Sequence, residues 1–194
     1  CEFTLPNGLV QGLNATAVQM ISSNVGYLTG YTNVANGTNF TTQTRGYLYK
    51  TENGGINWSR VTNTIGTKLS KVKMVNDTIG FAIGEAGLLL RTKDGGTSWD
   101  LMDTYSAEIT DAFTDMDVLA GASPVLRIVT KAGKYIDING TAYSTLSTPA
   151  NIPVPAGSGS ISDVKSVEQV SATEAYYAVT MQNGSDVYDA MIHT

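Results

Sequence analysis

Gly87-Leu-Leu-Leu-Arg-Thr-Lys-Asp-Gly-Gly-Thr-Ser-Trp99 decides the fold of this 194-residue chain, because a second version of the stretch lies upstream. That version is Gly46-Tyr-Leu-Tyr-Lys-Thr-Glu-Asn-Gly-Gly-Ile-Asn-Trp58. In both, an apolar segment ends in a basic residue and a threonine, enters a Gly-Gly turn and is followed by a tryptophan. A short apolar run that ends in a glycine turn predicts a strand entering a hairpin. The sequence therefore contains a repeated hairpin.

A second pair of matching segments shows that the repeat is longer than the hairpin. Met20–Gly30 lines up with Met74–Gly84, 54 positions downstream, in its apolar, turn and glycine positions. The two Gly-Gly-Trp segments are only 41 positions apart, so the first repeat holds 54 − 41 = 13 extra residues. These lie within residues 31–45, which are rich in threonine, asparagine and glycine. We interpret them as an insertion that could form a binding rim.

Each repeat contains four short strand candidates, which is the content of a propeller blade of about 40–45 residues. Two more divergent units follow, separated by residues 146–160, which hold three of the five prolines and are predicted to be an exposed connector. The strands expected in the last three units are Leu69–Val75, Gly80–Gly84, Leu88–Thr92 and Trp99–Met102; Ile109–Val118, Val125–Thr130 and Lys131–Ile138; and Ile161–Val167, Ala175–Thr180 and Val187–Thr194.

The sequence thus predicts an all-β fold, a β-propeller or partial propeller of about four four-stranded antiparallel blades. We place an N-terminal extended segment at residues 1–12 and the blades at approximately 13–65, 66–104, 105–148 and 158–194. The fourth unit stops where its Gly-Gly hairpin would come. Either the N-terminal segment supplies the missing outer strand, or the chain is part of a longer propeller.

The hairpins carry a recognisable motif. Thr92-Lys-Asp-Gly-Gly-Thr-Ser-Trp99 fits the pattern Ser/Thr-x-Asp-x-Gly-x-Thr/Ser-Trp at every defining position, and the upstream version departs from it at Asn53 and Asn57. A carboxylate or amide in a tight turn accepts hydrogen bonds from the backbone N–H groups that follow it. The glycines supply positive φ angles, and we expect the tryptophan ring to pack under the turn.

On these residues the chain resembles Asp-box (BNR-type) repeat β-propellers and is most similar to the photosystem II stability/assembly factor-like repeat family. The resemblance covers residues 13–103 well and 104–194 poorly. In that family the box is a fold device on the outer hairpin of a blade, away from the binding face. The resemblance therefore implies a structural role for Thr51, Asn53, Gly54, Gly55, Trp58, Thr92, Asp94, Gly95, Gly96 and Trp99.

Composition narrows the classes of partner. Hydrophobic residues make up 42% of the chain and charged residues only 15%, with a net charge of −5. Nucleic-acid binding needs clustered lysine and arginine, so we exclude it as the main function. Polarity that comes from threonine, serine, asparagine and glycine favours an extracytoplasmic location, at a cell surface, in a periplasm or in an extracellular particle.

Cys1 is the only cysteine, so no internal disulfide can form. A chain that starts with cysteine resembles a bacterial lipoprotein after signal removal, which makes Cys1 a possible lipidation site and the only route to a membrane. The alternative is that residue 1 is merely where this chain begins.

Candidate catalytic and metal-binding residues are few. His193 is the only histidine, so histidine-dependent triads and transition-metal sites are not expected. Asp111, Asp115 and Asp117 could share a strand face and attract Ca²⁺, but we expect a solvated acidic face. The four arginines are too scattered for the substrate clamp of a sialidase. We therefore predict no enzyme activity, no cofactor and no metal.

The predicted function is a non-catalytic extracytoplasmic binding or assembly module that presents a protein-recognition surface on a propeller scaffold. Its partners would be proteins, including other copies of itself or a larger assembly. One alternative is a structural subunit of a surface assembly such as a virion or filament. The other is a carbohydrate-binding or sialidase-like glycoside hydrolase propeller.

Overall fold

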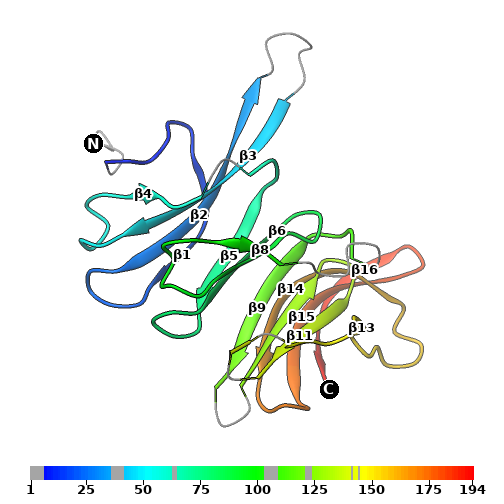
Figure 1. The fold of residues 1–194 in the computed structure, drawn as a ribbon. Coiled ribbons are helices and arrows are strands. Elements are labelled where there is room, and N and C mark those ends of the chain that lie inside the picture. The colour runs from blue at the N-terminus through cyan, green and yellow to red at the C-terminus, as the bar shows by residue number, and fades with distance from the viewer. Residues whose placement is uncertain are drawn as a thin grey trace. The chain divides into compact units, whose positions relative to one another are not determined.

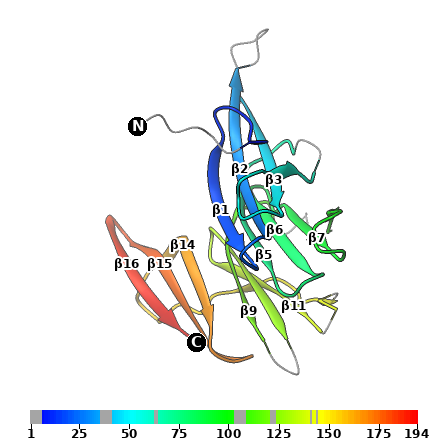
Figure 2. The same ribbon diagram turned by 90° about the vertical axis from the view of Figure 1, so that its left-hand side faces the viewer.

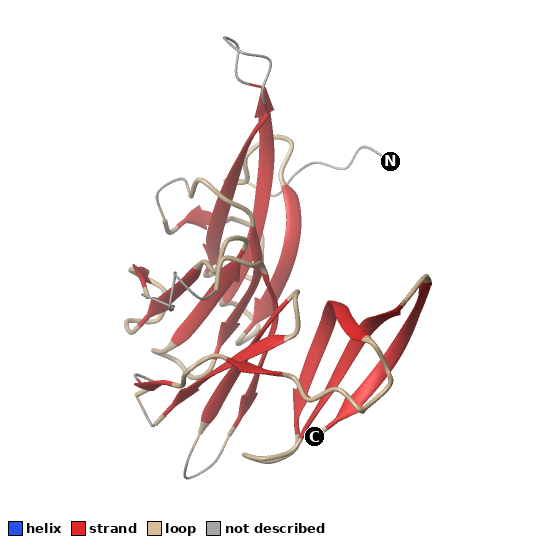
Figure 3. Ribbon diagram, turned by 90° about the vertical axis from the view of Figure 1, so that its right-hand side faces the viewer, coloured by secondary structure: helices blue, strands red, loops and turns tan. Residues whose placement is uncertain are grey.

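The computed structural model describes residues 7–35, 42–62, 65–102, 109–120, 124–140, 142–143 and 145–194. Every regular element in these ranges is a strand (Figure 3), and none of them contains a helix able to cross a membrane. The chain divides into two compact units, Cys1–Met102 and Asp103–Thr194. Each unit holds two antiparallel sheets, of four and four strands in the first and of five and three in the second. The predicted all-β fold of four antiparallel sheets is confirmed, whereas the blade boundaries stay a prediction.

The first unit is built from two four-stranded sheets in simple sequence order (Figure 1). The first sheet contains β1 (Asn14–Met20), β2 (Gly26–Ala35), β3 (Thr42–Thr51) and β4 (Ser59–Arg60). The second contains β5 (Leu69–Met74), β6 (Gly80–Gly84), β7 (Leu89–Thr92) and β8 (Asp100–Leu101). Each strand of the second sheet lies within the range predicted for it from the sequence.

The core of the first unit lies between its two sheets. Tyr27 and Leu48 of the first sheet pack with Leu69, Val72 and Ala82 of the second, and all five side chains are buried. Complete burial of an aliphatic or aromatic side chain contributes about 1.5–3 kcal/mol. This interface is therefore the main hydrophobic contribution that joins the two repeats.

The other face of the first sheet is covered by residues from the N-terminal segment. Leu9, Val10 and Leu13 pack against a buried cluster that includes Tyr49 and Trp58. The Trp58 N–H donates a hydrogen bond to the Asn7 carbonyl oxygen at 2.8 Å. The described residues of this segment thus cover the sheet face that points away from the second sheet.

Side chains of β1 also bond the backbone at the edge of the neighbouring sheet. The Gln19 amide accepts the Met74 N–H at 2.5 Å and donates to the Met74 carbonyl oxygen at 3.3 Å. The Thr16 hydroxyl donates to the Leu69 carbonyl oxygen at 2.8 Å. Backbone groups at a sheet edge need partners when they are removed from water, so these contacts fix β1 against β5.

The second unit contains a larger and a smaller sheet (Figure 2). The larger one has the order β12-β11-β10-β9, and β13 also pairs with β11. Its strands are β9 (Phe113–Leu119), β10 (Val125–Thr130), β11 (Lys134–Asn139), β12 (Thr145–Leu146) and β13 (Ala150–Asn151). The smaller sheet contains β14 (Ser160–Gln169), β15 (Ala175–Asn183) and β16 (Asp186–His193).

The prediction that residues 146–160 are an exposed connector is wrong in the middle of that stretch. Ile152 is only 3% exposed and packs in the core of the second unit with Val129 and Tyr177. Its N–H donates to the Gly133 carbonyl oxygen at 2.8 Å. The prolines do prevent a long strand, but one large aliphatic side chain between them gains enough by burial to anchor the segment.

A close backbone packing connects the two sheets of the first unit. The linker residues 65–68 run between Gly46 and Gly84, and we call this arrangement the glycine clamp. Gly46 donates its N–H to the Ile65 carbonyl oxygen at 2.8 Å, and Glu85 donates its N–H to the Lys68 carbonyl oxygen at 3.0 Å. A Cβ atom on Gly46 would lie 2.2 Å from the Thr67 carbonyl oxygen, and one on Gly84 would lie 2.3 Å from the Lys68 carbonyl oxygen. Only glycine allows this approach.

We expect Gly46→Ala and Gly84→Ala each to lower the free energy of unfolding by about 1–3 kcal/mol, because the added methyl group would meet backbone that cannot move aside. Urea unfolding monitored by circular dichroism measures the change.

Gly66→Ala is the matched control within the same linker, because no atom lies within 4 Å of a Cβ placed there. It should be neutral or slightly stabilising, since alanine reduces the entropy of the unfolded chain. Equal stability of the Gly46→Ala and Gly66→Ala proteins would show that the clamp is not tight.

Candidate functional site

The hairpin between β7 and β8 holds the complete box motif in a network centred on Asp94. Its carboxylate accepts hydrogen bonds from the Thr92 hydroxyl at 2.8 Å, the Ser98 N–H at 2.9 Å and the Ser98 hydroxyl at 2.6 Å. The Thr92 hydroxyl also accepts the Gly96 N–H at 2.8 Å. The bonds from Ser98, followed by that from Thr92, lower the pKa of Asp94 from 3.8 to about 2.

The hairpin between β3 and β4 repeats this network with one contact fewer. The Asn53 amide oxygen accepts the Thr51 hydroxyl at 3.1 Å and the Asn57 N–H at 2.9 Å, and the Thr51 hydroxyl accepts the Gly55 N–H at 2.9 Å. The missing contact is the one that the Ser98 hydroxyl makes with the second Asp94 oxygen. It is lost because the Asn53 amide has a single acceptor oxygen and because Asn57 takes the place of the serine. The glycines of both hairpins, Gly54, Gly55, Gly95 and Gly96, have positive φ angles.

The two box tryptophans have different neighbours. Trp99 packs at the core between the sheets, where Tyr27 meets its ring edge-on at a centroid distance of 6.3 Å and an interplanar angle of 70°. The Tyr27 hydroxyl donates to the Gly95 carbonyl oxygen at 2.7 Å, which joins the first sheet to the second box. Trp58 instead packs beneath Leu9 and Val10. The structural role predicted for the ten box residues stays a prediction, and Cys1 lies outside the described residues.

The acidic residues of the third unit do not form the solvated face that we expected. Asp115 is only 4% exposed, and its carboxylate accepts the Met116 N–H at 2.8 Å and the Val167 N–H at 3.0 Å. Asp117 accepts the Gln169 N–H at 2.9 Å. The Val167 and Gln169 N–H groups belong to the neighbouring β14, so the carboxylates satisfy a sheet edge that would otherwise be buried without partners.

The other sequence candidates for chemistry are also engaged in local contacts. Asp111 accepts the backbone N–H groups of Ala112 and Ala132, and the His193 ring stacks on Tyr176 at a centroid distance of 4.5 Å. Within the described ranges, no three histidine, cysteine, aspartate or glutamate side chains are grouped so that they could hold a metal ion.

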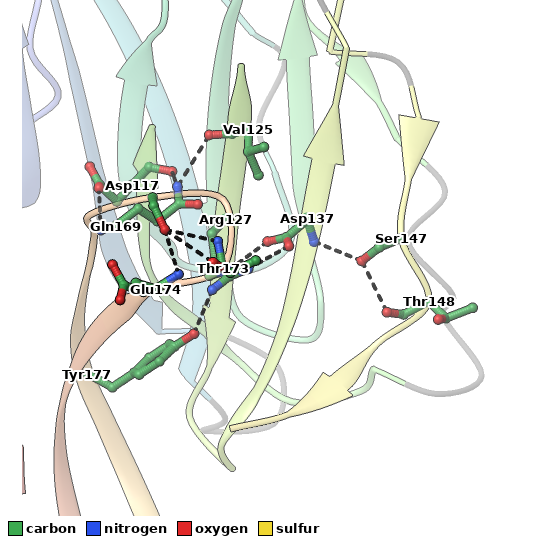
Figure 4. Close-up of polar contacts among 11 residues, drawn as sticks. Asp117, Val125, Arg127, Asp137, Ser147, Thr148, Gln169, Thr173, Glu174 and Tyr177 are labelled. Atoms are coloured by element: carbon green, nitrogen blue, oxygen red, sulfur yellow. Dashed lines mark hydrogen bonds and ion pairs between the residues drawn. The ribbon is translucent and has the colours of Figure 1, made fainter. Parts of the chain in front are cut away.

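Arg127 is the best-positioned buried cation of the second unit (Figure 4). It is 4% exposed and donates Nε and Nη2 to the two Asp137 carboxylate oxygens, each at 2.7 Å, and Nη1 to the Tyr177 hydroxyl at 2.9 Å. The Tyr135 ring lies 4.4 Å from its guanidinium carbon. Burial by itself lowers the pKa of Arg127, because it disfavours the charged form. The hydrogen bonds and charge interactions with Asp137 and Tyr177 outweigh this effect, so the pKa of Arg127 is raised. With these donors engaged, Arg127 is a link between strands and is not placed to hold a substrate carboxylate.

A polar hollow at one end of the first unit is the candidate binding site. It has a volume of about 500 Å³, and we call it the loop-end pocket. Its lining comes from the start of β3, from the linker of the glycine clamp and from the β6–β7 turn: Thr42, Gln43, Thr44, Arg45, Gly66, Thr67 and Glu85. Because β3 and β7 run from this end toward the boxes, the pocket lies at the opposite end of the sheets from the Gly-Gly turns.

The insertion in the first repeat forms one wall of this pocket. It extends β2 and β3 into a long paired arm, which projects toward the top of Figure 1, with Thr32 opposite Arg45 and Asn33 opposite Thr44. The second repeat has only the tight turn at residues 85–88 in the corresponding place, in which Ala86 adopts φ 55°. A left-handed conformation is uncommon for a residue other than glycine. Residues 36–41, the rest of the predicted rim, lie outside the described ranges.

Comparisons with known proteins identify the fold. No protein-family model and no curated protein matches the chain. Among solved structures it is similar to YCF48 bound to D1 peptide, with a TM-score of 0.54 and 16% identity over 94% of this chain and 58% of that one. It is also similar to YCF48 from Cyanidioschyzon merolae, with a TM-score of 0.50 and 12% identity over 95% of this chain and 73% of that one.

The resemblance that we inferred from the box motif is therefore confirmed at the level of the fold. The four sheets match part of the YCF48 propeller, and the chain spans little more than half of the first of these structures. At such low identity, the similarity carries no information about individual binding residues.

We expect the Asp94 network to make stability depend on pH in the acid range. Because the pKa is lowered from 3.8 to about 2, the stabilisation is fully present above pH 3.8 and is lost as the pH falls through about 2. Asp94→Asn should therefore have a lower Tm than the unchanged protein at pH 5, and the difference should shrink toward pH 2. Thermal unfolding at both pH values measures it. A difference that stays constant with pH would exclude the carboxylate charge as its source.

Proposed function

We propose that this chain is a non-catalytic binding or assembly module that recognises a protein through the loop-end pocket of its first unit. The observation that carries the proposal is that the pocket combines two charged side chains of opposite sign with a backbone floor held by the glycine clamp. The fold similarity to a protein solved with a bound peptide supports the same class of function. An extracytoplasmic location remains part of the proposal and rests on composition alone.

The two charges suit recognition of a polypeptide. Arg45 and Glu85 are both exposed, and neither forms an ion pair with another residue in the described part of the chain. They stand on separate segments that line the same hollow. A partner segment with an acidic and a basic side chain would complement both, and charge complementarity of this kind gives specificity and a faster association.

The floor of the pocket is suited to binding because it is already fixed. The linker is bonded on one side to Gly46 and on the other to Glu85, so the backbone next to Gly66 and Thr67 has little freedom to lose. Binding to a pre-organised surface avoids part of the ordering entropy that a flexible loop would cost. Hydroxyl and amide groups from the β3 arm surround this floor and can bond a peptide main chain.

A structural role in a larger assembly is the second candidate, and the edge of the smallest sheet favours it. The edge strand β16 exposes Val187 by 65% and Met191 by 71%. Exposed apolar side chains on a sheet edge favour pairing with another chain. Analytical ultracentrifugation across a concentration series distinguishes this role from a monomeric binding module.

The test of the proposed function is a peptide-display selection against the immobilised chain, followed by titration of the enriched peptides in solution. We expect enriched sequences to contain both an acidic and a basic residue. Arg45→Glu and Glu85→Lys should each weaken binding about tenfold or more, because a partner charge then faces a like charge.

Glu168→Lys, an exposed charge change in the second unit, is the matched control and should leave binding unchanged. Peptides whose affinity is the same for the unchanged protein and for both pocket variants would contradict the proposal. Turnover of a panel of aryl glycosides by the unchanged protein would instead support a glycoside hydrolase.

A further inference from the structure

A second hollow begins between the two box hairpins and extends along the first unit as far as Ile65. It consists of two adjoining parts of about 550 and 670 Å³, which share Arg60, Val61 and Thr97 in their walls. We call it the inter-hairpin groove. One wall is the segment that contains β4, and the other is the hairpin that leads into β8. A ligand for this groove goes beyond the proposed function, because the groove shares no lining residue with the loop-end pocket.

The floor of the groove is aliphatic. Val61, Ile65 and Leu90 line it and at the same time pack against the core between the two sheets. At its mouth, Leu101 is 70% exposed. A ligand group that covered these side chains would remove apolar surface from water, which is the general driving force for association.

Two buried polar atoms in the wall of the groove have no partner. Trp99 Nε1 and Thr62 Oγ1 are both shielded from solvent, and neither makes a hydrogen bond within the described part of the chain. Buried donors without an acceptor are uncommon in native proteins and need an explanation. The Trp99 ring is held in place by Tyr27, so its N–H has a fixed direction. A ligand that brings an acceptor oxygen would satisfy it.

The charged end of the groove favours an acidic ligand. Lys50 and Arg60 line it, against a single carboxylate, Glu52. Lys50 Nζ and Glu52 Oε1 are 3.0 Å apart, but the Glu52 side chain is 74% exposed. Water therefore screens this ion pair, and the attraction between the two side chains is weak. Arg60 also donates Nε to the Thr62 carbonyl oxygen at 2.8 Å and lies over the Tyr47 ring. In a chain of net charge −5, two cations that line the same groove give it a local positive charge.

We propose that the inter-hairpin groove binds an extended peptide that carries an aliphatic side chain next to an acidic one. The aliphatic side chain covers Val61, Ile65 and Leu90, a main-chain carbonyl oxygen accepts the Trp99 N–H, and the carboxylate lies beside Lys50 and Arg60. An extended chain places successive side chains on opposite sides, which matches a groove with an apolar floor and a charged flank.

The aliphatic floor favours a peptide over an oligosaccharide. A sugar ring is usually held against the open face of an aromatic ring, whereas the Trp99 ring is partly buried against the core and forms a T-shaped pair with Tyr27. The test below includes an oligosaccharide, so that sugar binding would be detected.

The two tryptophans make the test direct, because the protein has only two indole N–H groups. The ¹⁵N-labelled chain is titrated with acetylated, amidated Val-Asp-Val-Asp-Val, with the lysine version Val-Lys-Val-Lys-Val, and with maltotriose. We expect the aspartate peptide to shift the Trp99 indole resonance and to leave that of Trp58 in place. The lysine peptide should bind at least tenfold more weakly, and added salt should weaken binding of the aspartate peptide.

Trp99→Phe keeps an aromatic ring but removes the N–H donor. It should weaken binding of the aspartate peptide about fivefold to tenfold. The matched control Trp58→Phe changes the tryptophan of the other box, which is not among the residues that line the groove, and should leave affinity unchanged. Arg45→Glu in the loop-end pocket should also leave it unchanged.

Three results would overturn the proposal. They are an unshifted Trp99 resonance at millimolar aspartate peptide, equal affinity of the Trp99→Phe and unchanged proteins, and a Trp99 shift caused by maltotriose alone. Because the Arg45→Glu variant reports on the other pocket, failure here leaves the proposed function to its own test.

Discussion

The first unit depends on the close packing at the glycine clamp, where the backbone of the linker lies against the backbones of Gly46 and Gly84. Residues 65–68 must pass from the outer strand of one sheet to the inner strand of the next, and the space between Gly46 and Gly84 leaves no room for a Cβ. The same contact recurs one repeat earlier, where a Cβ on Gly30 would lie 2.6 Å from the Asn14 carbonyl oxygen. What the sequence repeats is therefore a way of bringing strands from successive segments together, and the loop-end pocket lies directly on this rigid crossing.

A second constraint is shared by both units. The innermost strand of one sheet uses polar side chains to bond the backbone of the next sheet, with Gln19 against Met74 in the first unit and Asp115 against Val167 in the second. The side chains differ, but the need is the same, because the edge of a sheet that packs against another cannot be left without partners. The second unit adds the buried Arg127–Asp137 pair, which stabilises the arrangement only as long as both partners are present.

Local features of the fold could be predicted from the sequence, and features that depend on tertiary partners could not. Short strands follow from apolar runs bounded by turns, so Gly80–Gly84 and Val125–Thr130 were predicted at their observed bounds. Asp115 was expected to be solvated because the Val167 N–H that its carboxylate accepts belongs to β14, far along the chain. The 13-residue insertion could be recognised from the sequence, and its role as a binding rim stays a prediction. Glu85 lies beside it in the loop-end pocket only through folding, and no pattern in the sequence connects the two.

The central claim is that the pocket floor is held in place before any partner arrives. Amide hydrogen exchange measured by NMR on the unliganded chain tests it most directly, at the N–H groups of Gly46 and Glu85 that bond the linker. We expect both to exchange about a thousandfold or more slowly than in an unstructured peptide, as amides in stable hydrogen bonds do. Exchange of either amide at the unstructured rate would mean that the linker is not clamped, and the account of a pre-formed recognition site would be wrong.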